Sequence, residues 1–200
     1  MSGMPTGPQC RAAVYWIEKD FAANYAWPDM PSDEDSLPFQ DRVETTDGTD
    51  WHSPEQFFMY NIQMPPADVF LFASGVPMLS RLAATELADL LTDGLMLPIN
   101  CSGGDYVAYR PPMLAGVLDL ERSVMDYNEE FGYASSVEHW EFKPEALADL
   151  TFFRLYEAWG FFGTERFMTR LKERDLTRGI VFEELWPNPA PGTYPQQLVF

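Results

Sequence analysis

Two histidines, two cysteines and several neighbouring carboxylates are the residues of this sequence that could carry chemistry. His52 and His139 stand outside the HxxxH and HExxH spacings of zinc sites. His139 lies in the alternating run VEHWEFK, which favours a structural histidine in a strand. Cys101 and Ser102 open the run CSGGD without a GxSxG elbow around them, and a glycine pair after a strand indicates a turn. We therefore predict no nucleophile and no metal site here.

Paired acids are the other candidates for catalysis. They are Asp119 with Glu121, Glu129 with Glu130, and Glu183 with Glu184. Acid–base catalysis by carboxylates requires a fixed separation in space, and in a chain with 31 acids such pairs arise freely. The DEDS run at 33–36 lacks the glycine and glutamate spacing of a calcium loop. We predict a non-enzymatic protein with no cofactor, and we keep a hydrolase using Asp119 and Glu121 as an alternative.

Composition restricts the class of protein and of partner. Apolar residues make up 46% of the 200 residues, enough to bury a core despite a formal charge of −18. The negative charge disfavours direct binding to nucleic acid or to an anionic membrane, and it suits a basic partner. Cys10 and Cys101 lie far apart without CxxC spacing, so we expect reduced thiols in a cytoplasmic protein. The sequence lacks a run of transmembrane length and a recognisable export signal.

Periodicity predicts an α+β fold: a mixed, mostly antiparallel sheet or sheets with two or three packed helices. We treat residues 1–200 as one domain with extended tails at 1–10 and 188–200. Expected strands alternate or form short apolar runs. They are 12–19, 95–99, 106–110, 115–121, 137–143, 152–156 and 180–186, and 68–74 is expected to be a short buried segment.

One pattern occurs twice. Ser80, a helix over 81–91, then Leu91-Thr92-Asp93-Gly94 precedes a strand, and Thr164, a helix over 165–174, then Leu176-Thr177-Arg178-Gly179 precedes another. The hydroxyl residues are candidate N-caps, and the glycines are candidates for the left-handed position after a helix. The repetition indicates two related halves, or a common helix–glycine–strand connection used twice.

The stretch from Trp27 to Trp51 differs from the rest. Between Asp29 and Asp50 it carries eight acids and one arginine, with neither helix nor strand periodicity. We predict an acidic surface loop over 27–51 that binds a partner. The predicted partner-binding residues are Asp33, Glu34, Asp35, Asp41, Glu44, Asp47 and Trp51. Bordering aromatic residues either complete this surface or anchor the loop to the core; these are Trp27, Phe39, Phe57, Phe58 and Tyr60.

Four stretches carry a resemblance to a known family: VPMLSRLAATELADLL, AGVLDLERSVM, LTFFRLYEAWG and TERFMTRLKERDLTRGIVFEEL. In this order they resemble bacterial immunity proteins of polymorphic toxin systems. That family ends in a Phe-Arg-Leu strand, a capped helix and a Leu-Thr-Gly-x-x-Phe motif, here at 153–155, 164–167 and 176–182. The match spans about residues 69–184, and Arg178 between Thr177 and Gly179 departs from the pattern.

The resemblance implies a protein that neutralises one cognate toxin by binding it. It carries no catalytic residues and no shared toxin-contacting positions. Because toxins that act on nucleic acid are commonly basic, a nucleic-acid-targeting toxin is the partner we expect. An acidic adaptor of a secretion system remains a further alternative, and the oligomeric state stays open.

Overall fold

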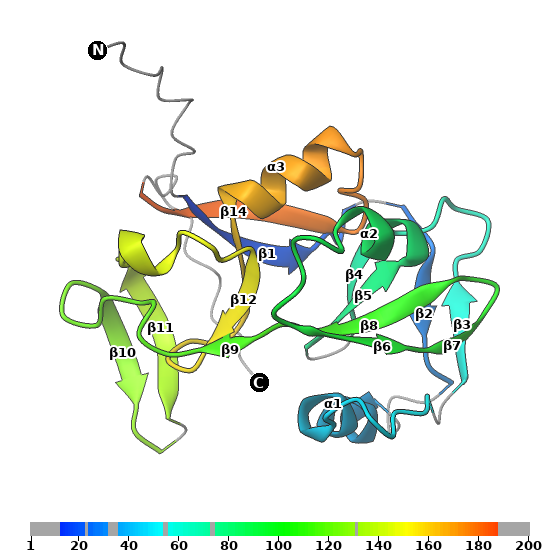
Figure 1. Ribbon diagram of the computed structural model, residues 1–200, viewed down its shortest axis with the longest axis horizontal. Helices are drawn as coiled ribbons and strands as arrows, with labels where there is room; N and C mark the ends of the chain where they lie inside the picture. The colour runs from blue at the N-terminus through cyan, green and yellow to red at the C-terminus, as the bar shows by residue number, and fades with distance from the viewer. Residues whose placement is uncertain are drawn as a thin grey trace, which may run out of the picture.

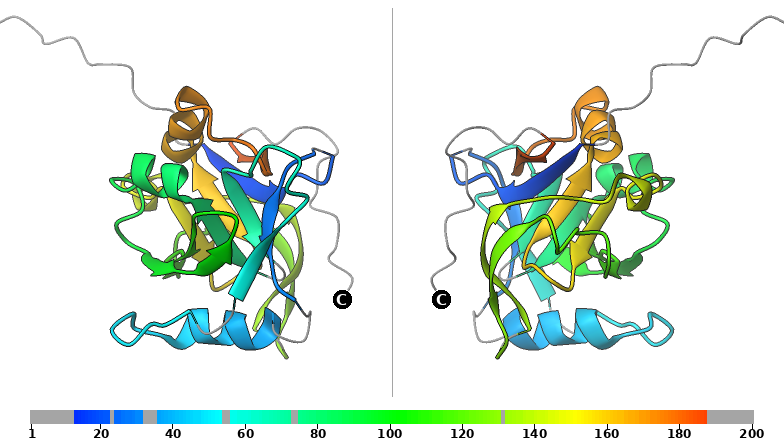
Figure 2. Two further views of the ribbon diagram at one scale, coloured as in Figure 1. Left: turned by 90° about the vertical axis from the view of Figure 1, so that its right-hand side faces the viewer. Right: turned by 90° about the vertical axis from the view of Figure 1, so that its left-hand side faces the viewer.

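The computed structural model describes residues 13–187 except 23, 32–35, 54–55, 73–74 and 131. Helices and mostly antiparallel sheets share this region, so the predicted α+β class is confirmed. Helices α2 (Arg81–Glu86) and α3 (Glu165–Glu173) lie together on one side, and α1 (Ser36–Thr45) lies on the opposite side (Figures 1 and 2). Among the described residues, no helix has both the length and the apolar character needed to cross a bilayer.

A five-stranded sheet forms one half of the core, in the order β14–β1–β13–β12–β9. Its strands are β1 (Val14–Lys19), β9 (Met113–Leu114), β12 (Phe152–Leu155), β13 (Phe161–Thr164) and β14 (Ile180–Trp186). Neighbours are antiparallel except β12 and β9, which are parallel. Both β12 and β13 are apolar on both faces because cores lie on either side of them.

A four-stranded sheet forms the other half, in the order β4–β5–β8–β6. Its strands are β4 (Val69–Phe72), β5 (Val76–Ser80), β6 (Leu95–Pro98) and β8 (Tyr106–Arg110). All three pairings are antiparallel. The predicted strands over 95–99 and 106–110 are therefore confirmed to within one residue, and the segment over 68–74, predicted only to be short and buried, contains β4.

The two sheets contain the same unit. Each begins with an antiparallel hairpin, β4–β5 or β12–β13, which leads into a helix and then into a further strand, β6 or β14. This last strand runs parallel to the second strand of the hairpin, and one antiparallel strand lies between the two. The inserted strand is β8 in one unit and β1 in the other. The hydrogen bonds also correspond: Arg81 N–H donates to Asp105 C=O at 2.8 Å, and Glu165 N–H donates to Ala13 C=O at 3.0 Å. This agreement supports two related halves over a chance recurrence of one connection.

The two units pack together through their helices. Leu87, Leu91, Phe167 and Leu171 share one buried cluster with residues of both sheets. The Arg170 guanidinium forms a bidentate ion pair with Asp89 of the other unit and donates to Glu86 C=O, and the Thr151 hydroxyl donates to Leu90 C=O. Apolar burial therefore holds the two halves together, and these polar contacts fix their orientation.

Helix starts and stops follow the sequence only in part. Ser80 caps α2 by accepting the Ala83 N–H at 3.1 Å, as predicted, but the helix ends at Glu86 and turns fill 87–90. Thr164 precedes α3, yet its hydroxyl donates to Leu150 C=O at 2.8 Å instead of capping the helix. Gly179 has the predicted positive φ, +106°, but it does not end α3: the helix ends at Glu173, and Asp175, with φ +56°, follows its C-cap Arg174. Gly179 lies instead in the turn before β14.

The prediction for Gly94 is wrong, because Gly94 is not among the glycines with positive φ. A Cβ at this position would lie 2.1 Å from the Tyr109 hydroxyl oxygen. Gly94 is therefore a point of close approach that lets the buried Tyr109 ring reach the core.

The predicted structureless loop over 27–51 is also wrong, since it contains a strand and a helix. Strand β2 (Trp27–Asp29) opens it, and α1 follows. Helix α1 buries only Phe39 and Val43, four residues apart on one face. Two apolar positions are too few for a recognisable period among so many acids and prolines, so tertiary contacts stabilise this helix.

Two further strand predictions need correction. The predicted strand over 115–121 is replaced by turns, apart from the bridge between Leu118 and Phe142. The predicted strand over 137–143 is the end of β11 (Tyr133–His139), which pairs with β10 (Val124–Asn128), and a 3-10 turn η2 (Pro144–Ala146) follows. Strands β2, β3 (Gln56–Tyr60) and β7 (Asn100–Ser102) form a three-stranded sheet.

Candidate protein-binding surface

The predicted partner-binding residues divide into three groups in the structure. Asp33, Glu34 and Asp35 lie outside the described residues. Asp41 and Asp47 are exposed, whereas Glu44 and Trp51 are half-buried and contact the rest of the fold. Of the four described residues, two therefore face solvent and two are attached to the fold.

Glu44 attaches α1 to the unit that contains the β12–β13 hairpin. Its two carboxylate oxygens accept hydrogen bonds from Nη1 and Nη2 of Arg154, each at 2.6 Å, and the two side chains are 30% and 13% exposed. Arg110 completes the attachment, because its Nη1 donates to the carbonyls of Val43, Glu44 and Thr46 at the end of α1. These carbonyls are the groups that a helix end leaves without partners. Glu44 thus has a structural role that its sequence context did not predict.

Trp51 is an anchor as well. Its indole N–H donates to Pro98 C=O at 2.7 Å, and its ring lies 6.1 Å from that of the buried Phe39. Phe39 and Phe57 are fully buried in the same cluster. For these three aromatic residues, the alternative that they attach the acidic segment to the core is correct.

Asp41 and Asp47 present their carboxylates to solvent on α1 and on the turn after it. Asp47 accepts hydrogen bonds from the Thr49 backbone N–H at 2.9 Å and from the Thr49 hydroxyl at 2.7 Å. These hydrogen bonds lower the pKa of Asp47, so this carboxyl remains ionised in mildly acidic solution. The α1 side of the molecule therefore carries fixed negative charge.

The outer surface of the β2–β3–β7 sheet carries the remaining aromatic residues. Strand β3 alternates, with Phe57 and Met59 inside and Phe58 and Tyr60 outside. Phe58 is 37% and Tyr60 is 51% exposed. Trp27 pairs with Tyr60 across the strands, and their rings lie 4.6 Å apart. Asp29 pairs with Phe58, so a carboxylate flanks these rings on the same sheet face.

Lys19 and Phe21 extend this surface beyond the end of β1. The Lys19 Nζ lies 4.5 Å from the centre of the Phe70 ring, 5.2 Å from that of Trp27 and 5.3 Å from that of Phe21. Burial lowers the pKa of Lys19, although the nearby Asp29 opposes this effect. Phe21 is 86% exposed. We call Phe21, Trp27, Phe58 and Tyr60 the aromatic face.

Sequence reasoning missed the role of Lys19, which it placed at the end of the strand over 12–19, and it made no assignment for Phe21. An aromatic residue two positions after the lysine that ends a strand is a weak signal for a binding surface, because the sequence is compatible with a buried ring as well as with an exposed one. The three rings near the Lys19 ammonium group belong to residues 21, 27 and 70, and only the fold brings these residues together.

The candidates for chemistry are scattered over the fold: Asp119 and Glu121 lie in a turn region, Glu183 and Glu184 in β14, and Cys101 in β7. Asp119 accepts the backbone N–H groups of Glu121 and Arg122 and so closes a turn. His139 is 52% exposed at its side chain, with Nε2 3.7 Å from a Glu141 carboxylate oxygen. Burial raises the pKa of the Cys101 thiol to about 11, which opposes thiolate formation. Within the described part of the chain, no three metal-binding side chains converge.

Comparison with known proteins adds no family to these observations. No model of a known protein family matches the chain, and a search of curated proteins found no match. The surface itself is therefore the basis for a functional proposal.

Proposed function

We propose that this chain is a non-enzymatic immunity protein that binds and neutralises a basic protein toxin in the cytoplasm. The aromatic face is the observation that carries the proposal. Exposed rings of Phe21, Phe58 and Tyr60 beside the half-buried Trp27 combine the residue types that dominate the binding energy of protein interfaces. A soluble protein that keeps such a cluster in water gains from covering it with a partner.

Charge supports a basic partner. The formal charge is −18, Asp29 flanks the aromatic face, and Asp41 and Asp47 are exposed on the α1 side. Opposite charge accelerates encounter and disfavours acidic partners, whereas apolar contact supplies most of the lasting affinity. A toxin that acts on nucleic acid meets the charge requirement because its substrate is a polyanion.

The test uses the product of the gene adjacent to the one that encodes this chain. We expect the two proteins to co-purify as a stoichiometric complex, and co-expression to restore growth of cells that make the neighbour. Association should slow by about tenfold or more between low and physiological ionic strength, since exposed charges are screened over about 8–10 Å there. An acidic or harmless neighbour that elutes alone would contradict the proposal.

A matched pair of variants tests the surface. Phe58→Ser with Tyr60→Ser removes two exposed rings of β3. Val124→Ser with Tyr127→Ser removes two exposed apolar side chains of β10, one of them a ring, where the residues are 51% and 47% exposed. We expect the β3 variant to lose binding by about a hundredfold or more, as loss of interface anchors of about 2 kcal/mol or more each predicts. The β10 variant should bind like the unaltered protein, and equal loss in both variants would refute this choice of surface.

A further inference from the structure

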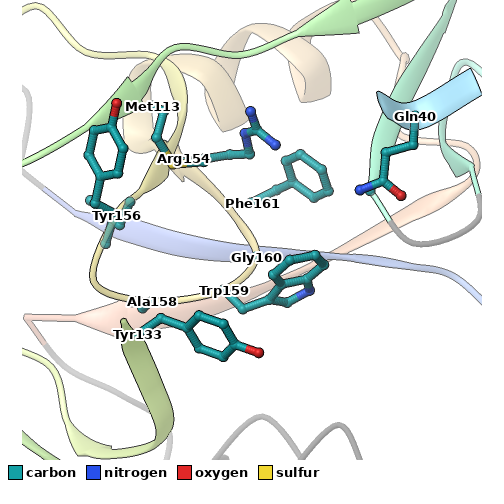
Figure 3. A pocket seen from close by; sticks show the side chains of 11 residues that line it. Gln40, Met113, Tyr133, Arg154, Tyr156, Ala158, Trp159, Gly160 and Phe161 are labelled. Atoms are coloured by element: carbon teal, nitrogen blue, oxygen red, sulfur yellow. The ribbon is translucent and has the colours of Figure 1, made fainter. Parts of the chain in front are cut away.

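An apolar pocket lies where the two related units meet on the side away from α2 and α3. The turn after β4 contributes Gly75, and the equivalent turn after β12 contributes Tyr156, Trp159 and Gly160. An ideal Cβ at Gly75 would lie 4.0 Å from the rings of both Trp159 and Phe161, which measures how closely the two turns approach. The pocket has a volume of about 180 Å³, and Figure 3 shows the side chains around it. We call it the apolar slot.

Aromatic and aliphatic side chains form the slot. Phe161, Leu155 and Ala158 are buried beneath it. Trp159, Tyr156 and Met113 form its rim and are 41%, 62% and 37% exposed. The Tyr133 ring lies 6.4 Å from that of Trp159 and supports it from β11. A rigid floor beneath exposed apolar walls is a pre-formed site for an apolar group.

The charge of the lining excludes an anionic ligand as the natural occupant. Arg154 borders the slot, but Glu44 takes both of its Nη atoms. The adjoining cleft, of about 640 Å³, balances Arg154 and Arg110 with Glu44 and Asp93. The slot is therefore locally neutral within a molecule of charge −18.

The volume selects the kind of occupant. Sites for drug-sized molecules and cofactors span roughly 300–1,000 Å³, so the slot is too small for them and suits one side chain. Rings on several sides favour an aromatic occupant, because ring pairs add edge-to-face and stacking contacts beyond area burial. The net charge of −18 of the whole molecule favours basic neighbours on the same partner.

We propose that the apolar slot receives one aromatic side chain flanked by basic residues from the protein partner. This inference rests on the proposed function, since it assumes a basic protein as the ligand. Helix α1 places negative charge near the slot: Gln40 lines the slot, and the next residue, Asp41, is exposed to solvent.

The test uses short blocked peptides and does not require the toxin. The protein is labelled with 5-fluorotryptophan, and the Trp159 signal is assigned with Trp159→Phe. The probes are acetyl-Arg-Phe-Arg-amide, acetyl-Arg-Gly-Arg-amide and acetyl-Glu-Phe-Glu-amide. We expect a saturable shift of the Trp159 signal with the first peptide, and at least tenfold weaker binding of the other two.

Two variants separate the slot from the general surface. Met113→Trp narrows the rim and should reduce binding of acetyl-Arg-Phe-Arg-amide at least tenfold. Val124→Trp makes the same kind of change at an exposed residue of β10 and should leave it unaltered. An unmoved Trp159 signal, equal binding of the Phe and Gly peptides, equal binding of the Arg and Glu peptides, or no effect of Met113→Trp would overturn the inference.

The outcome is distinguishable from failure of the proposed function. If the peptide fails to bind but the adjacent gene product forms a salt-dependent complex, only the slot assignment falls. If the peptide binds but the gene product does not, the slot stands as an aromatic-binding site and the immunity proposal falls.

Discussion

Replacing Glu44 by glutamine distinguishes a structural role from a binding role at a residue that the sequence assigns to the interface. The change removes one charge while keeping a side chain of similar shape. It leaves the Arg154 guanidinium, only 13% exposed, without its carboxylate partner. Arg154 Nε is already buried without a hydrogen-bond partner, so the guanidinium would lose the carboxylate that accepts from both of its Nη atoms.

The expected magnitude follows from burial and geometry. Exposed ion pairs contribute about 0.2–1 kcal/mol, whereas breaking a buried pair costs about 3–5 kcal/mol. The Glu44–Arg154 pair is bidentate, with both distances at 2.6 Å, but its carboxylate is 30% exposed. We therefore expect Glu44→Gln to lower the free energy of unfolding by about 2–3 kcal/mol, which is roughly 4–12 °C in Tm for a chain of this size.

Urea unfolding and calorimetry provide the assay, and Asp41→Asn is the matched control. Asp41 stands one turn before Glu44 on the exposed side of α1, so its replacement should change the unfolding free energy by less than about 0.5 kcal/mol. A double-mutant cycle with Arg154→Met should give a coupling energy of about 1–3 kcal/mol. Equal stability of the Glu44 and Asp41 variants, or a cycle with no coupling, would refute the assignment of Glu44 to the attachment of α1.

Three further predictions concern charge, glycine and proton binding. Neutralising the three acids at 33–35 together should slow association with the toxin and leave Tm almost unchanged. Stopped-flow binding measures the association rate, and calorimetry measures Tm. A large fall in Tm would show that these acids support the fold. Gly179→Ala should lower the free energy of unfolding in urea by about 1–3 kcal/mol more than Gly116→Ala does. Both positions have positive φ, but of the two only Gly179 would place a Cβ 2.1 Å from the Val69 carbonyl oxygen. Equal losses in the two variants would contradict this clash. Burial raises the pKa of Asp68 above its ordinary 3.8, so the protonated carboxyl is favoured by folding and this contribution is lost as pH rises above 3.8. Asp68→Asn should therefore be at least as stable as the unaltered protein at pH 7 and lose that advantage near pH 3–4, and the reverse order in urea titrations at the two pH values would contradict the assignment.

Local sequence determined the parts of the fold whose physical cause is local. A hydroxyl residue can accept the free N–H groups of the helix that follows it, and Ser80 does so for α2. Glycine adopts positive φ without steric cost, and Gly179 uses this freedom after α3. Short apolar runs identified β6, β8, β12 and β14 as strands, and they identified the segment that contains β4 as buried. The recurrence of helix, glycine and strand also anticipated the two related units.

Tertiary structure decided the remainder, because distant residues supply the cause. Helix α1 depends on Arg110 and Arg154, which lie 64–67 and 110 positions from the groups they bind. Gly94 is required by the Tyr109 ring and not by its own backbone angles. The residue type of Thr164 made it a candidate N-cap, but only the fold shows that its hydroxyl donates to Leu150 C=O instead of capping α3.

The same reason explains the candidate sites. Acidity and abundant aromatic residues indicated a protein-binding surface, but they did not distinguish the buried Phe39 and Phe57 from the exposed Phe58 and Tyr60. Strand register made that distinction, since neighbouring residues of β3 point to opposite faces of its sheet. The apolar slot has no sequence signature, because it forms where two turns that are far apart in the chain meet.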